Sequence, residues 1–260
     1  MQSIVDKQYK EPSIFNPENL LREARRQKGL PDCNVPEVCV LDPDGDIVRY
    51  LQKNNLGELN QCWACYHSDL YTFKSGPLTL GIVGCAVGAS YAVLVAEQLF
   101  VSGCQLLISI TSAGIINPII GSDFIIITES LRDEGTSYHY LPSQEKSEIN
   151  LNLLDNLSPI LSDPTLFVSK GKSWTTDAPY RETQSSIDYA KSLDITAVEM
   201  EAAALYAFAK AKNKFVVCFA HLTNTMAQQH GDFEKGEENG SISTLKLIEK
   251  TAKYLFSDNQ

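Results

Sequence analysis

The sequence predicts a single α/β domain in three layers, α/β/α, around a mixed, mostly parallel central sheet. Segments that are apolar throughout alternate with helical segments, a pattern typical of a sheet covered by helices on both faces. The chain has 260 residues, which suits one large α/β domain. A hydrophobic content of 43% against 21% charged residues is that of a globular protein.

The first 34 residues are predicted to form an N-terminal helical arm ahead of the main domain, residues 35–260. Asn16-Pro17-Glu18 supplies an N-cap, a proline at the first helical position and an early acid. The helix is expected to end at Gly29, and two prolines then mark a linker.

Beyond the linker, apolar runs and turn residues predict the remaining elements in chain order. Helices are expected over residues 89–103, 201–212 and 241–256. Residues 145–162 are polar and are predicted to form a surface excursion. The predicted strands cover residues 37–41, 78–88 with a glycine-rich turn at the end, 106–114, 123–131, 166–176, 195–200 and 215–223.

Charge and hydropathy exclude several classes of function. The formal net charge is −10, which argues against nucleic acid as a partner, because phosphate backbones select surfaces rich in Lys and Arg. No apolar run reaches the roughly 18 residues that a membrane-spanning helix needs. The N-terminus carries no hydrophobic signal region, so no membrane partner is expected and the predicted location is cytoplasmic.

The seven cysteines are expected to be reduced, as is usual in the cytoplasm. Several lie in apolar runs, where a thiol packs as a small hydrophobic group. Cys62-Trp-Ala-Cys65 has neither a second CxxC nor a paired His, so it predicts two packed thiols and no metal site.

Ligands of open α/β sheets bind beyond the carboxyl ends of the strands, so the residues there are the candidates for chemistry. The turn from Gly84 through Gly88 to Ser90 offers backbone N–H groups to an anion at the start of a helix. Small residues at this turn also suit close packing of strand on helix, and both interpretations stay open.

Glu199-Met200-Glu201 is the most informative stretch, since two carboxylates flank a thioether directly after an apolar strand. A carboxylate can accept hydrogen bonds from two vicinal hydroxyls, and Met can pack against a sugar ring or a base. Acids also favour a helix N-terminus through its dipole, which explains one glutamate but not both.

Two loops combine polar and aromatic residues. Asp177 lies among hydroxyls, Tyr180 and Arg181, which suits recognition of the edge of a heterocycle, although an Asp before Ala-Pro is also an ordinary turn residue. The second loop, residues 132–140, contains His139, and a single His in such a loop is more often structural than catalytic.

The run VEMEAAALYA resembles the signature of the nucleoside phosphorylase family, which includes uridine phosphorylase, hexameric purine nucleoside phosphorylase and the methylthioadenosine/S-adenosylhomocysteine nucleosidases. The similarity spans residues 35–256, and SLRDEGTSYHYLP is similar to the uridine phosphorylase branch. The resemblance implies an α/β fold and cleavage of the N-glycosidic bond of a nucleoside. It further implies no metal or organic cofactor, inorganic phosphate as co-substrate, and a homo-oligomer (dimer, trimer or hexamer).

The resemblance also implies roles for individual residues. Glu201 would hold the ribose hydroxyls, Glu199 would support that site, and Ser112 falls where phosphorylases place a Thr that contacts phosphate and sugar. The catalytic residues implied are Glu201, Asn224 and Asp177. The substrate-binding residues implied are Glu199, Met200, Ser112, Tyr180, Arg181, His139 and Gly88.

The phosphate-binding arginines of the phosphorylases are missing. Ser109 stands in place of the Arg before the phosphate turn, and the turn after the first strand, residues 41–45, keeps Asp-Pro but loses its Gly and Arg. No third Arg lies near residues 67–69. The substitutes available are Arg49, Arg132 and Arg181.

The predicted function is therefore a nucleoside phosphorylase, with two alternatives open. One is a nucleosidase, in which the acidic turn of Asp42, Asp44 and Asp46 activates water, although those acids are equally typical of a solvated turn. The other is an inactive nucleoside-binding protein. Asn224 stands where purine-cleaving members carry an Asp, and an amide cannot supply a proton, which favours a pyrimidine-like leaving group.

Overall fold

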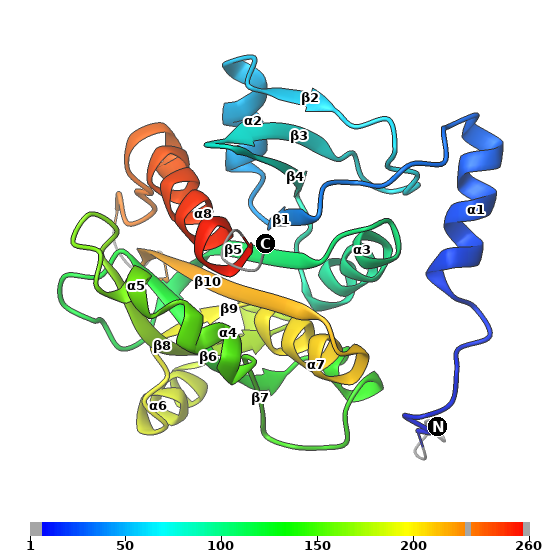
Figure 1. Cartoon of the computed structure of the whole chain (residues 1–260). Coiled ribbons are helices and arrows are strands. Elements are labelled where there is room, and N and C mark those ends of the chain that lie inside the picture. Colours follow the sequence, from blue (N-terminus) through cyan, green and yellow to red (C-terminus); the bar gives the residue numbers. More distant parts are fainter. Residues whose placement is uncertain (1–6, 227–229, 257–260) are drawn as a thin grey trace.

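The computed structural model describes residues 7–226 and 230–256, and its central feature is one large β-sheet (Figure 1). Its strands are β1 (Val38–Asp42), β2 (Gly57–Leu59), β3 (Tyr71–Ser75), β4 (Leu78–Gly84), β5 (Leu106–Ile115), β6 (Phe124–Asp133), β7 (Lys146–Glu148), β8 (Val168–Thr176), β9 (Ala197–Glu199) and β10 (Phe215–Asn224).

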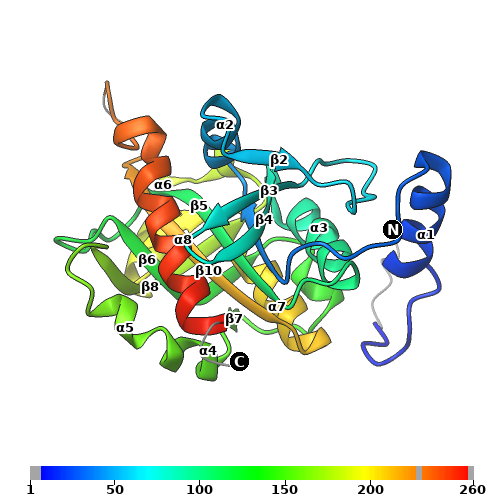
Figure 2. The same ribbon diagram turned by 45° about the horizontal axis from the view of Figure 1, so that its top comes forward.

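Helices flank the sheet on both sides (Figures 1 and 2). Helices α3 and α7 pack against each other, as do α2 and α8. The helices are α1 (Pro17–Lys28), α2 (Asp46–Lys53), α3 (Ala89–Val101), α4 (Leu151–Asn156), α5 (Ser158–Leu161), α6 (Gln184–Ser192), α7 (Ala202–Lys212) and α8 (Ser241–Phe256), with 3₁₀ turns η1 (Ser137–His139), η2 (Pro179–Arg181) and η3 (Glu237–Gly240).

The predicted α/β class with a mixed central sheet is confirmed. The strand order is β10-β6-β8-β9-β5-β1-β4-β3-β2, with β7 paired to β6. Within the described residues, five of the ten strand pairings are parallel, so the sheet is less parallel than the sequence predicted. Three of the antiparallel pairs arise because the short strands β2, β7 and β9 pair with a neighbouring strand in the opposite direction.

Strand β5 organises the centre of the sheet. One of its edges pairs with β10 along almost its whole length, and this extra pairing closes β5, β10, β6, β8 and β9 into a ring. Its other edge pairs first with β1, up to Ser109, and then with β9, from Gly114. Between these two partners the described chain provides no strand for residues 110–113 on that edge. We call this opening the fork.

The long apolar elements lie where the sequence predicted them, since each buried run forms a strand or a packed helix. Helix α2, strands β2 and β3, and helix α6 were not predicted. The predicted surface excursion, residues 145–162, instead carries β7, α4 and α5, and its apolar residues Leu157 and Ile160 are fully buried. The apolar residues of this segment stand in short groups among polar residues, so the sequence did not indicate buried elements there.

The N-terminal helix α1 forms as its sequence predicts. The Asn16 side chain accepts a hydrogen bond from the Asn19 N–H, Pro17 opens the helix, and Gly29 ends it in the left-handed conformation at φ 64°. Its buried residues, Leu21 and Ala24, lie against the body of the protein.

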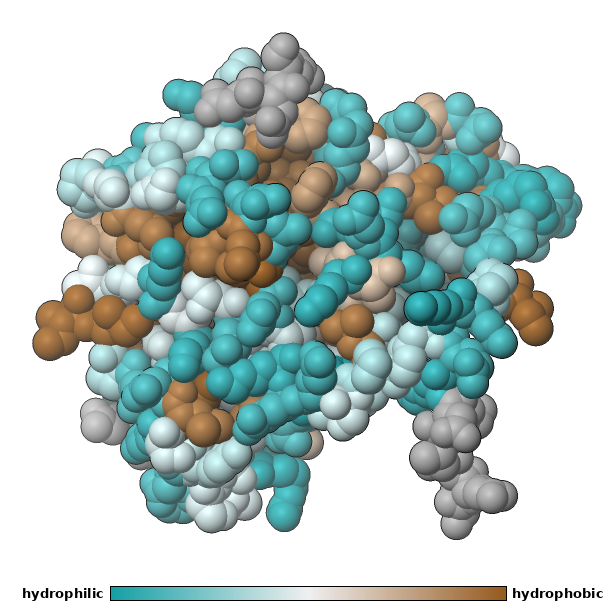
Figure 3. All heavy atoms as spheres, turned by 60° about the horizontal axis from the view of Figure 1, so that its bottom comes forward, coloured by the Kyte–Doolittle hydropathy of each residue, from teal (hydrophilic) through white to brown (hydrophobic). Residues whose placement is uncertain are grey.

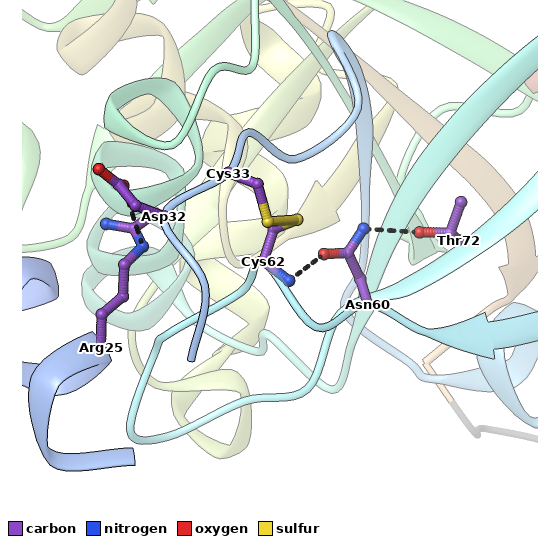
Figure 4. Close-up of a disulfide and its surroundings, with 6 residues drawn as sticks. All are labelled: Arg25, Asp32, Cys33, Asn60, Cys62 and Thr72. Atoms are coloured by element: carbon purple, nitrogen blue, oxygen red, sulfur yellow. Dashed lines mark hydrogen bonds and ion pairs between the residues drawn. A yellow bond between two sulfur atoms is a disulfide. The ribbon is translucent and has the colours of Figure 1, made fainter. Parts of the chain in front are cut away.

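The cysteine prediction is wrong for Cys33 and Cys62, which form a disulfide (Figure 4). The linker after α1 runs beside the loop that follows β2, so the two Cα atoms lie 5.2 Å apart, within the range that a disulfide spans. The residues are 29 positions apart in sequence, and nothing in that spacing indicates the pairing. Cys65 is a buried free thiol, as predicted.

On the face shown in Figure 3, hydrophobic residues lie in separate patches among hydrophilic ones. Among the described residues, no helix combines the length and the apolar composition needed to cross a bilayer.

Tyr206 joins α7 to two strands and gives a first testable prediction. Its hydroxyl donates to the carbonyl of Ile127 (2.6 Å) and accepts the N–H of Cys218 (3.0 Å), and the side chain is fully buried. Tyr206→Phe leaves both backbone groups buried without this partner, so we expect the free energy of unfolding to fall by about 1–3 kcal/mol. Urea denaturation measures this change. Tyr189→Phe, at an exposed site, is the control, and equal unfolding midpoints for both variants would contradict the prediction.

Candidate active site

At the fork, one backbone N–H of β5 has no partner strand and donates a hydrogen bond to a side chain. Because β1 leaves β5 after Ser109, the N–H of Ser112 has no strand partner and donates instead to Oδ2 of Asp44 (2.8 Å). Asp44 reaches this N–H because Pro43 follows Asp42 at the end of β1, and a proline cannot continue the ladder. A carboxylate therefore lies at the position that the sequence assigned to phosphate.

The three acids of the turn have three different surroundings. Asp42 is buried, and its carboxylate accepts the N–H groups of Gly45 and Val48 (3.0 Å each), which fixes the turn into α2. Burial, reinforced by the charges of Asp44 and Asp46, raises the pKa of Asp42 to about 7. The interpretation as a solvated turn is thus wrong for Asp42.

Two cations neutralise the outer acids of the turn. Lys235 Nζ lies 2.7 Å from Oδ2 of Asp46 and 3.4 Å from Oδ2 of Asp44. Arg49 Nη2 lies 2.8 Å from Oδ1 of Asp46 and donates to the carbonyl of Asp44 (2.7 Å). Although burial opposes its charge, the two carboxylates raise the pKa of Lys235. These contacts hold the turn in place and leave the Asp44 carboxylate partly exposed.

Both carboxylate oxygens of Glu199 accept hydrogen bonds from the protein itself. Its Oε1 accepts hydroxyls of Thr175 and Ser173, and its Oε2 accepts the backbone N–H groups of Glu201 and Ala202 (2.7 Å each). The register of β9 on β8 places Thr175 directly beside Glu199. With these donors on both oxygens, Glu199 fixes the first turn of α7 and the backbone of Glu201.

Glu201 has a free oxygen. Its Oε1 accepts the N–H of Gly88 (2.7 Å), whereas Oε2 is buried and has no hydrogen-bond partner in the described part of the chain. Burial is the main cause that raises the pKa of Glu201 to about 8, and the charges of Glu199 and Asp44 add to it. An unpaired buried oxygen is costly, and a ligand hydroxyl at Oε2 removes that cost.

Gly88 and Ser112 therefore form a matched pair. The turn that contains Gly88 was predicted to offer backbone N–H groups to an anion, and Ser112 was expected to contact phosphate and sugar. In the structure the N–H groups of both residues donate to carboxylates of the same chain, Glu201 and Asp44. The negative charge of Asp44 contributes to raising the pKa of Glu201, so the two carboxylates interact electrostatically. Met200 is half-buried between Glu199 and Glu201.

Asn224 lies in β10, on the edge of β5 away from the fork. Its register on β5 places it beside Gly114, and its side chain is buried. Oδ1 accepts the N–H of Met226 (2.8 Å), and Nδ2 donates to the Thr223 hydroxyl (3.1 Å). Nδ2 carries a second hydrogen, which can donate to a ligand.

The residues of the predicted base-side loop separate into two places. Tyr180 is 99% exposed on η2 and lines a cavity of about 420 Å³ with Thr225 and Met226, immediately after Asn224. Asp177 accepts the N–H of Gly135 (2.8 Å) and thereby ties this loop to the turn after β6. Arg181 lies exposed beside Tyr180.

His139 lies in a different cavity. It is exposed on η1 and lines a groove of about 1,080 Å³ between α1 and α3, together with Tyr140 and Phe208. The groove also includes Ser90, at the start of α3. The structure thus does not bring His139 together with Tyr180.

Of the three arginines considered as phosphate ligands, only Arg49 lies at the acidic turn. Arg132 is buried and donates to Ser137 Oγ and to the carbonyls of Leu141 and Pro142. Arg181 lies at the base-side loop. Arg49 lines a cavity of about 630 Å³ next to Gly45 and Cys85.

Comparison with known proteins decides the family. The model of the phosphorylase superfamily matches residues 41–253, which is most of the chain. The chain belongs to the phosphorylase superfamily. The match begins in β1 and ends in α8, so it includes every residue of the fork and both glutamates.

Curated relatives of this superfamily member are distant. An uncharacterised protein of Acanthamoeba polyphaga mimivirus is 31% identical over 140 residues, which cover 54% of each protein. The chain thus spans about half the length of that relative. The uridine phosphorylase of Thermococcus kodakarensis is 22% identical over 238 residues, which cover 81% of this chain and 84% of the relative.

Solved structures share the superfamily fold. Uridine phosphorylase of Vibrio fischeri superposes with a TM-score of 0.70 at 20% identity, over 86% of this chain and 92% of that chain. The 5'-methylthioadenosine/S-adenosyl homocysteine nucleosidase of Campylobacter jejuni superposes with a TM-score of 0.68 at 14% identity, over 85% and 100%. Phosphorylases and nucleosidases therefore both have this fold.

Sequence reasoning missed three parts of the site. The contact between Asp44 and Ser112 depends on the fork, and the hydroxyls that hold Glu199 come from other strands, so local patterns do not indicate either. Lys235 lies in a polar stretch with no distinguishing signal. Within residues 7–226 and 230–256, no group of three or more His, Cys, Asp or Glu could hold a metal ion.

Proposed function

We propose that this protein cleaves the N-glycosidic bond of a nucleoside and uses water as the nucleophile. One observation carries the proposal: the carboxylate of Asp44 occupies the N–H of Ser112, where the family resemblance expects phosphate. A phosphate dianion at this place would have to displace a like charge. Water, in contrast, can bind beside Asp44 and pass a proton to it.

The remaining residues fit the same reaction. As the bond breaks, positive charge develops on the pentose and negative charge on the base. Oε2 of Glu201 is free to accept a ribose hydroxyl and to stabilise the positive pentose. On the base side, Asn224 can donate a hydrogen bond but no proton, which favours a pyrimidine-like leaving group whose charge lies on carbonyl oxygens.

Phosphorolysis is the second candidate, and Arg49 favours it. Its guanidinium lies at the acidic turn and lines the adjoining cavity. Together with Lys235 it would supply two cations if Asp44 moved away from Ser112. The relative named uridine phosphorylase is consistent with this candidate.

The identity of the sugar product separates the candidates. The purified protein is incubated with pyrimidine and purine nucleosides, with and without phosphate, and the product is analysed by mass spectrometry. We expect free pentose at the same rate in both conditions. Pentose 1-phosphate that forms only with phosphate would overturn hydrolysis in favour of phosphorolysis, and binding without turnover would support the inactive alternative. Glu201→Gln, prepared identically, controls for contaminating enzymes.

A further inference from the structure

The disulfide connects two segments that would otherwise be separate at the surface. Cys33 lies in the linker after α1, and Cys62 lies in the loop between β2 and β3 (Figure 4). Both cysteines are half-buried, and their neighbours Asp32, Asn34 and Gln61 are exposed. A small dithiol can therefore reach the sulfur atoms.

Apart from the disulfide, the arm attaches to α3 and to the same loop. Leu21 and Ala24 of α1 pack with Ala64, which is only two residues after Cys62. Lys28 Nζ donates to the carbonyl of Cys65, and the Tyr66 hydroxyl donates to the side chain of Gln27 (2.7 Å). In Figure 1, α1 lies at the edge of the molecule, and α3 is its neighbouring helix. The arm and the loop thus hold each other in place.

The loop also lies close to the acidic turn, because both line the same cavity. The Tyr91 hydroxyl of α3 donates to the carbonyl of His67 (2.7 Å) and anchors the far end of the loop. Residues 65–69 form one wall of the cavity of about 630 Å³, and Arg49 and Cys85 lie on another. The ring that the disulfide closes, residues 33–62, also includes β1, the acidic turn and α2.

We propose that the Cys33–Cys62 disulfide is a thiol–disulfide switch that fixes the arm (residues 7–34) and the loop (residues 60–69) beside the acidic turn. A dithiol reductant supplies two electrons and two protons, the S–S bond breaks, two thiols form, and the dithiol itself closes to a cyclic disulfide. Once reduced, the arm is held by its apolar contacts with the loop and with α3 and by a few surface hydrogen bonds. Local opening of the arm then becomes frequent.

Thiol counting and limited proteolysis test the switch without any assay of turnover. Protein purified without reductant and unfolded in denaturant is expected to show five free thiols, because two of the seven cysteines are paired. Seven free thiols would overturn the proposal. Trypsin can cleave at the basic residues of α1, and we expect dithiothreitol to speed this cleavage on the order of tenfold, since proteolysis follows local opening.

The double variant Cys33→Ser/Cys62→Ser is the matched control. Its arm is expected to be cleaved at the fast rate with and without dithiothreitol. A double variant that still responds to dithiothreitol would assign the effect to another thiol, and equal rates for oxidised and reduced wild type would overturn the switch. Hydrogen exchange of the α1 amides gives a second readout that does not depend on protease access.

The link to the active site rests on the proposed function. Reduction is expected to raise KM for the nucleoside several-fold and to leave kcat nearly unchanged, because the loop lines a cavity at the acidic turn and carries none of the proposed catalytic groups. Arm release with an unchanged KM would overturn this link. Absence of turnover in both redox states would count against the proposed function and leave the proteolysis result standing.

Discussion

Replacing Glu201 by glutamine is expected to lower kcat/KM for nucleoside cleavage by about 100- to 1,000-fold, the usual cost of removing one preorganised electrostatic contact. Burial raises the pKa of Glu201 to about 8, so the two enzymes are compared above pH 8, where the wild-type side chain is largely ionised. The amide can keep the hydrogen bond from Gly88, but at that pH it brings no negative charge to the pentose. Steady-state kinetics measure the loss. Glu58→Gln, exposed on β2, is the matched control and should retain full activity. A Glu201→Gln enzyme within twofold of wild type would remove Glu201 from the reaction.

The same variant should alter the dependence of stability on pH. Burial raises the pKa of Glu201 to about 8 in the folded protein, against an ordinary value of 4.5. Its contribution to stability is therefore complete below pH 4.5 and is lost as the pH rises towards 8, by an amount on the order of 4 kcal/mol. Glu201→Gln should lose less stability than wild type between pH 5 and pH 8.5 in urea denaturation. The remaining slope comes partly from Asp42, whose pKa is raised to about 7.

Asp44→Asn should have the second large effect. The amide oxygen can still accept the Ser112 N–H, so the turn should keep its shape, but the side chain can no longer take a proton from water. We expect hydrolysis to fall by about 100- to 10,000-fold, the range for removal of a general base. Asp155→Asn, exposed on α4, is the control, and wild-type turnover in Asp44→Asn would refute the role of water activation.

Asp44→Ala sharpens the test, because it removes the carboxylate that accepts the Ser112 N–H and lies 3.4 Å from Lys235 Nζ. Phosphate then meets a backbone donor and a lysine in place of a like charge. We expect phosphate to accelerate this variant and pentose 1-phosphate to appear among its products. If phosphate changes neither the rate nor the product, the fork is not an anion site.

The positions of the strands and of the glutamates at a strand–helix junction follow from local sequence, because apolar runs and an alanine-rich helix define them. The different roles of Glu199 and Glu201 do not follow from local sequence. Glu199 is saturated by Thr175 and Ser173 from a neighbouring strand, and only the register of β8 on β9 brings them together. Two acids separated by a single residue look alike in sequence until their partners are known.

Two of the errors have the same origin. The disulfide joins segments 29 residues apart, and the site's Lys235 comes from a stretch far along the chain. Helix α2 was missed because it is short and follows a turn rich in aspartate. The disulfide and the position of Lys235 depend on contacts between distant segments, which composition and periodicity do not encode.

The opening between β1 and β9 is a property of main-chain pairing. Substitutions at residues 110–113 can change what lines it, but they cannot close it, because closure requires another strand. Pro43 prevents β1 from being that strand. A homologue with this proline further along its chain would be expected to extend β1 along β5 and to leave fewer residues of that edge unpaired.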